Sequence, residues 1–105
     1  MLSNQLKAEI KKRLLTKFEI DKIILFGSQA KGTASKKSDI DLLLIGKVKY
    51  DRYKMMTDVI RSLSKMNHAF DVVILSQEEY ETNKFIPGTV ARYAYKEGKV
   101  IYEKK

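Results

Sequence analysis

Three short apolar runs, separated by segments with helical spacing, constrain the fold of this chain most strongly. The runs occupy residues 22–26, 39–45 and 70–75, and they consist largely of Ile, Leu, Val and Phe. Each is shorter than a typical buried helix, and Gly27 and Asp39 interrupt the pattern at their polar ends, so we interpret them as buried strands. Strands that alternate with helices predict an α/β (α+β) fold, in which a small mixed β-sheet is flanked by helices.

The first two helices are predicted from apolar spacing. From Ser3, a possible N-cap, to Phe18 an apolar residue recurs at every fourth position, which places one stripe of a helix against a core. A second helix is expected behind Asp51, another possible N-cap. Its apolar stripe is expected to contain Met56, Val59, Ile60 and Leu63.

The last third of the chain carries clear start and stop signals for helices. Ser76 and Glu79 have the spacing of a capping box, which predicts a short helix directly after the third strand. Pro87 and Gly88 interrupt that helix. Residues 89–97 favour a further helix with Gly98 just beyond its end, followed by a terminal edge strand over residues 100–102.

Composition limits the class of protein. A chain of 105 residues is long enough for one compact domain, 1–105, and too short for a separate acceptor-binding domain, so a protein partner is plausible. The formal charge of +8 attracts polyanions such as nucleotides or nucleic acid, although paired lysines are more often a solvated face. The chain has no cysteine, which excludes disulfides and thiolate zinc sites. Its polar, charged beginning resembles neither a signal peptide nor a membrane span, so a cytoplasmic location is expected.

Two aspartates open the second strand and form the candidate metal site. Side chains alternate along a strand, so Asp39 and Asp41 should project together while Ile40 points into the core. Two carboxylates this close repel each other unless a cation lies between them, and oxygen ligands suit magnesium. An isolated Asp-x-Asp is more often solvated charge or part of a turn, so the metal interpretation depends on its surroundings.

Asp71 and Gly27-Ser28 supply those surroundings. If the third strand lies beside the second with matching ends, Asp71 completes a triad of carboxylates, in which it is our candidate general base. Gly27 allows close approach of the backbone to phosphates, and the Ser28 hydroxyl can add a hydrogen bond. Ser28 can also be a plain helix cap, and the two roles can coexist.

This combination resembles the signature of the DNA polymerase β-like nucleotidyltransferase superfamily. Gly27-Ser28 is followed, after ten residues, by Asp39-Ile40-Asp41, and the fuller strings from Gly27 to Gly32 and from Ser38 to Leu42 resemble its minimal nucleotidyltransferase (MNT) branch. That branch has a third aspartate on a later strand, which Asp71 matches. Several motif parts at fixed spacing are far more specific than any one of them.

The resemblance implies a nucleotidyltransferase fold and a specific activity. Members of this branch are often antitoxins whose toxin is a helical HEPN-domain ribonuclease, and they transfer AMP from ATP onto a tyrosine of that toxin. For this chain the resemblance implies catalytic and magnesium-binding roles for Asp39, Asp41 and Asp71, with Gly27 and Ser28 binding ATP.

Two alternatives remain open at the level of sequence. The protein could be an antitoxin that neutralises its partner by occlusion, with no need for catalysis. It could also be a nucleotidyltransferase whose acceptor is a small molecule or an RNA end, which the positive charge would suit. A homodimer or a hetero-oligomer is compatible with either function.

Overall fold

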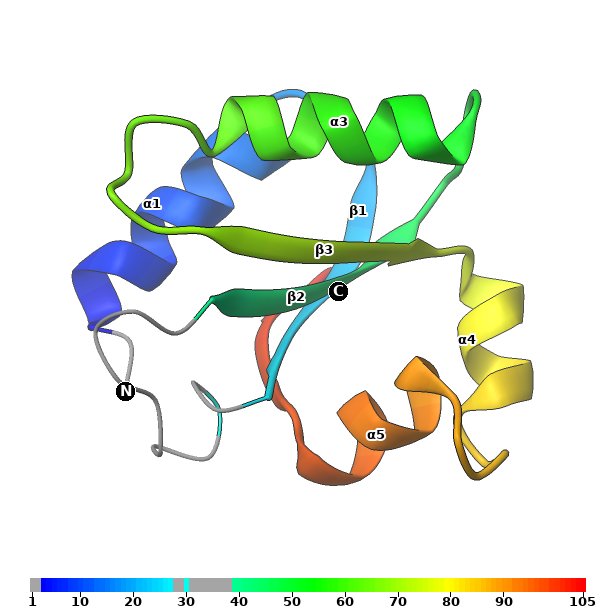
Figure 1. Ribbon diagram of the computed structural model, residues 1–105. Helices are drawn as coiled ribbons and strands as arrows, with labels where there is room; N and C mark the ends of the chain where they lie inside the picture. Colours follow the sequence, from blue (N-terminus) through cyan, green and yellow to red (C-terminus); the bar gives the residue numbers. More distant parts are fainter. Residues whose placement is uncertain (1–2, 28–29, 31–38) are drawn as a thin grey trace.

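A four-stranded sheet forms the middle layer of the computed structural model, which describes residues 3–27, 30 and 39–105 (Figure 1). Within that part of the chain, two helices cover each face of the sheet. In chain order the elements are α1 (Asn4–Leu15), β1 (Ile20–Phe26), β2 (Ile40–Gly46), α3 (Arg52–Ser62), β3 (Phe70–Leu75), α4 (Gln77–Asn83), α5 (Val90–Glu97) and β4 (Lys99–Glu103).

The sheet is mixed, as the sequence predicts. Its strand order is β3-β2-β1-β4, so β4 is an edge strand. β1 pairs antiparallel with both β2 and β4, whereas β2 and β3 run parallel. The crossover from β2 to β3 through α3 is the kind of helical connection that a parallel pair requires.

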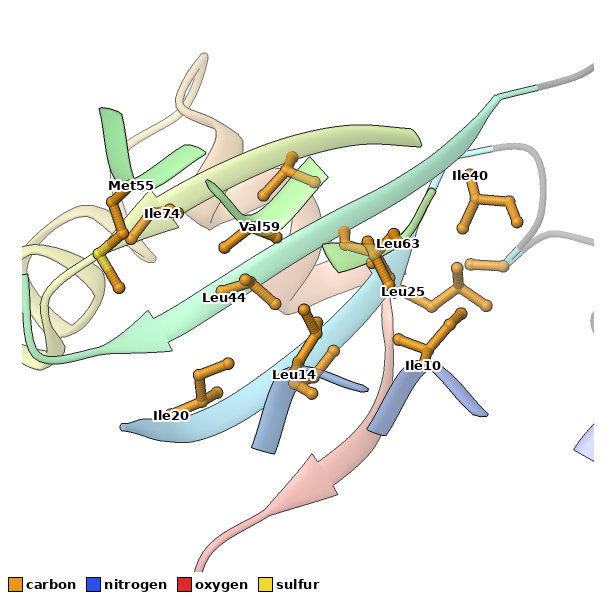
Figure 2. Packing of buried hydrophobic residues seen from close by; sticks show 14 residues of the cluster. Ile10, Leu14, Ile20, Leu25, Ile40, Leu44, Met55, Val59, Leu63 and Ile74 are labelled. Carbon is orange, nitrogen blue, oxygen red and sulfur yellow. The ribbon is translucent and has the colours of Figure 1, made fainter. Parts of the chain in front are cut away.

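Alternate residues of the central strands face the two helical layers. Ile40 and Leu42 are fully buried on the side of α1 and α3, where they belong to the larger apolar cluster. Leu43 and Ile45 are fully buried on the other side, against α4 and α5. Figure 2 shows the larger cluster, in which Ile10, Leu14, Leu44, Met55, Val59 and Leu63 pack between the sheet and its two covering helices.

The predicted caps are present. The Ser3 side chain accepts a hydrogen bond from Leu6 N, and the Asp51 side chain accepts one from Lys54 N. Ser76 and Glu79 form both hydrogen bonds of the capping box. These short polar side chains satisfy backbone donors that have no partner inside the helix, and so they fix where each helix begins.

The structure corrects two details of the prediction and adds a reason for a third. The buried stripe of α3 is Met55, Val59 and Leu63, while Ile60 is 43% exposed, because the burial follows steps of four residues and Ile60 lies a further 100° around the helix. α1 ends at Leu15 rather than near Phe18. Gly98 follows the last residue of α5, as predicted, but with extended backbone at φ −83°, and its lack of a side chain is required by packing, since a Cβ would lie 2.5 Å from Ile24 Cγ2.

Candidate active site

The sheet brings Asp41 and Asp71 side by side. β2 and β3 pair in parallel, and their register sets Asp41 directly opposite Asp71. Neighbouring strands lie about 4.8 Å apart, and residues opposite each other point to the same face. The prediction that the third strand lies beside the second with matching ends is therefore confirmed.

These two aspartates face the layer of α4 and α5. Asp41 is paired with Phe26 of β1, and Phe26 packs against the apolar cluster on that side of the sheet. Asp39 lies one residue before β2 and is exposed. It is close enough to Asp41 for the two carboxylates to interact electrostatically.

Burial and like charges both act on Asp41. Partial burial is the largest cause that raises the pKa of the Asp41 carboxyl above its ordinary value, and the negative charges of Asp71 and then Asp39 raise it further. The ionised form of Asp41 is therefore disfavoured until a positive charge compensates it. This electrostatic arrangement is what a cation-binding carboxylate needs.

Gly27 lies directly against the Asp41 carboxylate. Its φ of +74° is in the left-handed region, and a Cβ at this position would lie only 2.1 Å from Asp41 Oδ2. Glycine is thus required twice, by backbone conformation and by space. The sequence predicted a turn glycine at a phosphate cradle but gave no signal of this contact.

The ring of Phe26 connects the carboxylate edge to α5. Phe26 and Tyr93 make an edge-to-face contact, with 6.0 Å between ring centroids and an angle of 71° between planes. Because Phe26 is the register partner of Asp41, α5 flanks the candidate site. Sequence reasoning assigned Tyr93 no role in the site.

One predicted site residue does not enter this description, because Ser28 lies outside the described residues. The single histidine of the chain, His68, is exposed and lines a hollow beside α1, in the layer opposite the carboxylates.

The carboxylates suit a hard divalent cation with open coordination positions. Among residues 3–27, 30 and 39–105, no group of three Asp, Glu, His or Cys side chains is placed to hold a metal ion. Magnesium is usually bound by one or two carboxylates together with substrate phosphates and water. The in-register pair of Asp41 and Asp71, with Asp39 nearby, fits that mode.

Two sequence comparisons decide the family. A sequence profile described as polymerase beta, nucleotidyltransferase, matches residues 8–105. Over 85 residues the chain is 40% identical to MJ0604 of Methanocaldococcus jannaschii, named as a candidate protein adenylyltransferase, and the match covers 79% of each protein. This chain belongs to the polymerase beta nucleotidyltransferase family.

Other members share parts of the sequence and the fold of this nucleotidyltransferase. MJ1305 of the same organism, named like MJ0604, is 50% identical over 42 residues, which cover 36% of this chain and 29% of that protein. A crystal structure named as a candidate nucleotidyltransferase from Sulfolobus solfataricus superposes with a TM-score of 0.62 at 21% identity, covering 93% of this chain and 77% of that one.

The fold also occurs in solved toxin–antitoxin complexes. One is a tri-AMPylated Shewanella oneidensis HEPN toxin in complex with MNT antitoxin, matched with a TM-score of 0.60 at 20% identity over 97% of this chain and 74% of the other. Another is a toxin–antitoxin with AMP-PNP, matched with a TM-score of 0.60 at 21% identity over 94% and 74%. At this identity the likeness establishes that the nucleotidyltransferase has their fold.

No helix in the described part of this nucleotidyltransferase is long and apolar enough to cross a membrane.

Proposed function

We propose that this protein transfers AMP from magnesium-bound ATP to the hydroxyl of a protein acceptor, a tyrosine of a cognate HEPN-domain toxin, and acts as its antitoxin. The observation that carries the proposal is the Asp41–Asp71 register pair with Gly27 packed against it. The name of MJ0604 and the AMPylated toxin in a structural neighbour support AMP as the transferred group and a protein as the acceptor.

In this proposal Asp39, Asp41 and Asp71 hold the cation, and Gly27 and Ser28 receive the phosphates of ATP. A bound divalent cation neutralises charge on the phosphates and on the leaving pyrophosphate. Asp71, at the exposed edge of the group, accepts the proton of the attacking hydroxyl. The oxygen of the acceptor hydroxyl then bonds to the α-phosphorus. The bond from that phosphorus to the bridging oxygen of the β-phosphate breaks, and pyrophosphate leaves.

Exposed apolar side chains on and before α5 support a protein acceptor. Large apolar side chains on α5 and on the loop before it are between 40% and 60% exposed, and they are Phe85, Ile86, Val90, Tyr93 and Tyr95. Phe85 and Tyr95 are in ring contact at 5.5 Å, and Tyr93 reaches the carboxylate edge through Phe26. Apolar surface rich in aromatic residues is typical of protein interfaces.

The acceptor can be identified with ATP labelled at the α-phosphate. Wild type and Asp41→Asn are incubated with magnesium and host extract, and then with the product of the neighbouring gene. We expect label on one protein band that resists ribonuclease, maps to a tyrosine and is absent with the variant. Label on RNA or on a small molecule would contradict a protein acceptor, and full neutralisation of the toxin by Asp41→Asn would favour occlusion.

A further inference from the structure

The positive charge of the protein is concentrated in one helical layer. Residues 4–18, which include α1, carry five Lys or Arg against one acidic residue, and residues 47–65, which include α3, carry six against two. These two segments account for the whole formal charge of +8, since the rest of the chain has ten basic and ten acidic residues. α1 and α3 lie on the face of the sheet opposite α4, α5 and the aspartates (Figure 1).

A groove follows the line between α1 and α3 on the outside of this layer. It consists of four hollows of about 680, 240, 290 and 310 Å³, and each shares lining residues with the next. Lys12 lines the first two hollows and Lys17 the last three. Apart from Arg13, the basic residues that line the groove are Lys12, Lys17, Lys47, Lys49, Arg61 and Lys65.

The acidic residues of the groove are already engaged. Glu9 pairs with Arg13, which also donates to the carbonyl oxygens of Ser62 and Ser64 and so joins the two segments. Glu19 pairs with Lys47 and Lys49, and Asp58 accepts a hydrogen bond of 2.6 Å from Tyr50. Within residues 3–27, 30 and 39–105, no ion pair neutralises Lys12, Lys17 or Arg61.

An exposed tyrosine lies at the end of the groove near α3. Tyr50 lines the last hollow and is 40% exposed, and Tyr53, in the first turn of α3, is 79% exposed but lines none of the four hollows. Lys54 Nζ lies 5.3 Å from the centre of the Tyr50 ring. A positively charged groove that can follow a backbone, next to aromatic rings on which bases can stack, is the arrangement used to bind single-stranded nucleic acid.

We propose that the α1–α3 groove binds the phosphate backbone of a single-stranded nucleic acid. This would be a second site, separated from the carboxylate edge by the sheet and independent of the transfer reaction. An acidic protein would meet the same lysines, but it would not use the exposed tyrosines as stacking surfaces. The charges of Lys12, Lys17 and Arg61 are spread over the successive hollows of the groove, which favours a continuous polyanion over one free phosphate.

The test is fluorescence anisotropy with labelled oligouridylate, oligothymidylate and duplex DNA over a range of salt concentrations. The groove variant is Lys12→Glu/Lys17→Glu/Arg61→Glu, with Lys12→Gln/Lys17→Gln/Arg61→Gln as a milder form. The control Lys99→Glu/Lys104→Glu/Lys105→Glu changes net charge by the same amount on and after β4, where all three residues are exposed. A variant that still binds nucleotide is folded, so nucleotide binding is measured for each variant as a control.

We expect the wild type to bind a single strand with strong salt dependence. The groove variant should lose at least about tenfold in affinity at low salt, and the slope of log affinity against log salt should fall by roughly 2, near 0.7 per lost contact. The control should change affinity by less than about threefold. Tighter binding of duplex, equal weakening by groove and control variants, or no binding by the wild type would each overturn the proposal.

Discussion

Gly27 lies against the Asp41 carboxylate in the proposed site and leaves no room there for a side chain. The turn glycine follows β1 and the aspartate belongs to β2, so the antiparallel pairing of these strands is what brings them together. The sequence predicted both residues as parts of one site, because their motif and spacing are specific. The sequence could not predict that the Asp41 carboxylate leaves no room for a side chain at position 27, since that depends on backbone placement to within an ångström.

Replacement of Gly27 by alanine should impair activity more than stability. The added Cβ would displace the Asp41 carboxylate, and a misplacement of about 1 Å at reacting groups costs roughly 10²-fold in rate. Gly88→Ala is the matched control, because Gly88 also has positive φ, +88°, but open space around the missing Cβ. Both variants should lose about 1 kcal/mol or more of stability from backbone strain, measured by thermal unfolding. Equal AMP transfer by the two would contradict the contact.

The raised pKa of Asp41 predicts an unusual pH dependence of stability. Its folded-state pKa lies above the unfolded value of about 3.9, so the favourable contribution of the protonated form is present at low pH and is lost as pH rises through the folded pKa. Metal-free Asp41→Asn should therefore melt a few degrees higher than wild type at neutral pH, a difference that narrows toward acid. A lower melting temperature for Asp41→Asn at neutral pH would contradict like-charge repulsion at this site.

At the scale of elements, the sequence predicted all four strands and the N-caps of α1, α3 and α4, because the spacing of apolar residues, β-rich runs and capping residues are local signals. The parallel pairing of β2 with β3 is non-local, and the sequence supported it only as a condition for bringing Asp71 to the site. Arg52 was missed for the same reason. It donates to Glu79 at 2.8 and 3.0 Å and joins the start of α3 to the start of α4 across 27 residues of sequence.

The hydrogen bonds of Glu79 to Ser76 and Arg52 should contribute measurably to the free energy of unfolding. Hydrogen bonding to Ser76 and the Arg52 guanidinium lower the pKa of Glu79, so its contribution is present above the unfolded pKa of about 4.3 and is lost as pH falls through the folded pKa. Glu79→Ala should cost about 1 kcal/mol at neutral pH, as typical for a lost cap, and less in acid. Glu78→Ala on the same turn is the control. Equal effects of the two substitutions would show that the capping box and Arg52 contribute nothing specific.

At the scale of the whole molecule, the sheet separates two faces of different character. Carboxylates and exposed aromatic residues lie toward α4 and α5, whereas the net positive charge lies on α1 and α3. Overall charge was visible in the sequence. Its distribution between the two layers could be seen only once the topology had placed each helix on its face.

Ligand binding at the carboxylate edge should stabilise the whole domain. Magnesium with a non-hydrolysable ATP analogue at about 100 times the dissociation constant contributes about 2.7 kcal/mol, which for a domain of this size is a rise of roughly 10–20 °C in melting temperature. Magnesium alone or the analogue alone should not give this rise in melting temperature, and the Asp41→Asn substitution should abolish the rise. A full shift in the presence of a chelator would show that the nucleotide binds without a divalent cation.

The central claim is that Asp41 and Asp71 together support transfer of AMP. The most direct measurement is the single-turnover rate of transfer from α-labelled ATP to the purified acceptor by wild type, Asp41→Asn, Asp71→Asn and the control Asp21→Asn, where Asp21 lies in β1 away from the site. We predict losses of about 10²–10⁴-fold for both site variants and less than about threefold for Asp21→Asn. A rate for Asp41→Asn or Asp71→Asn close to that of the wild type would contradict the account.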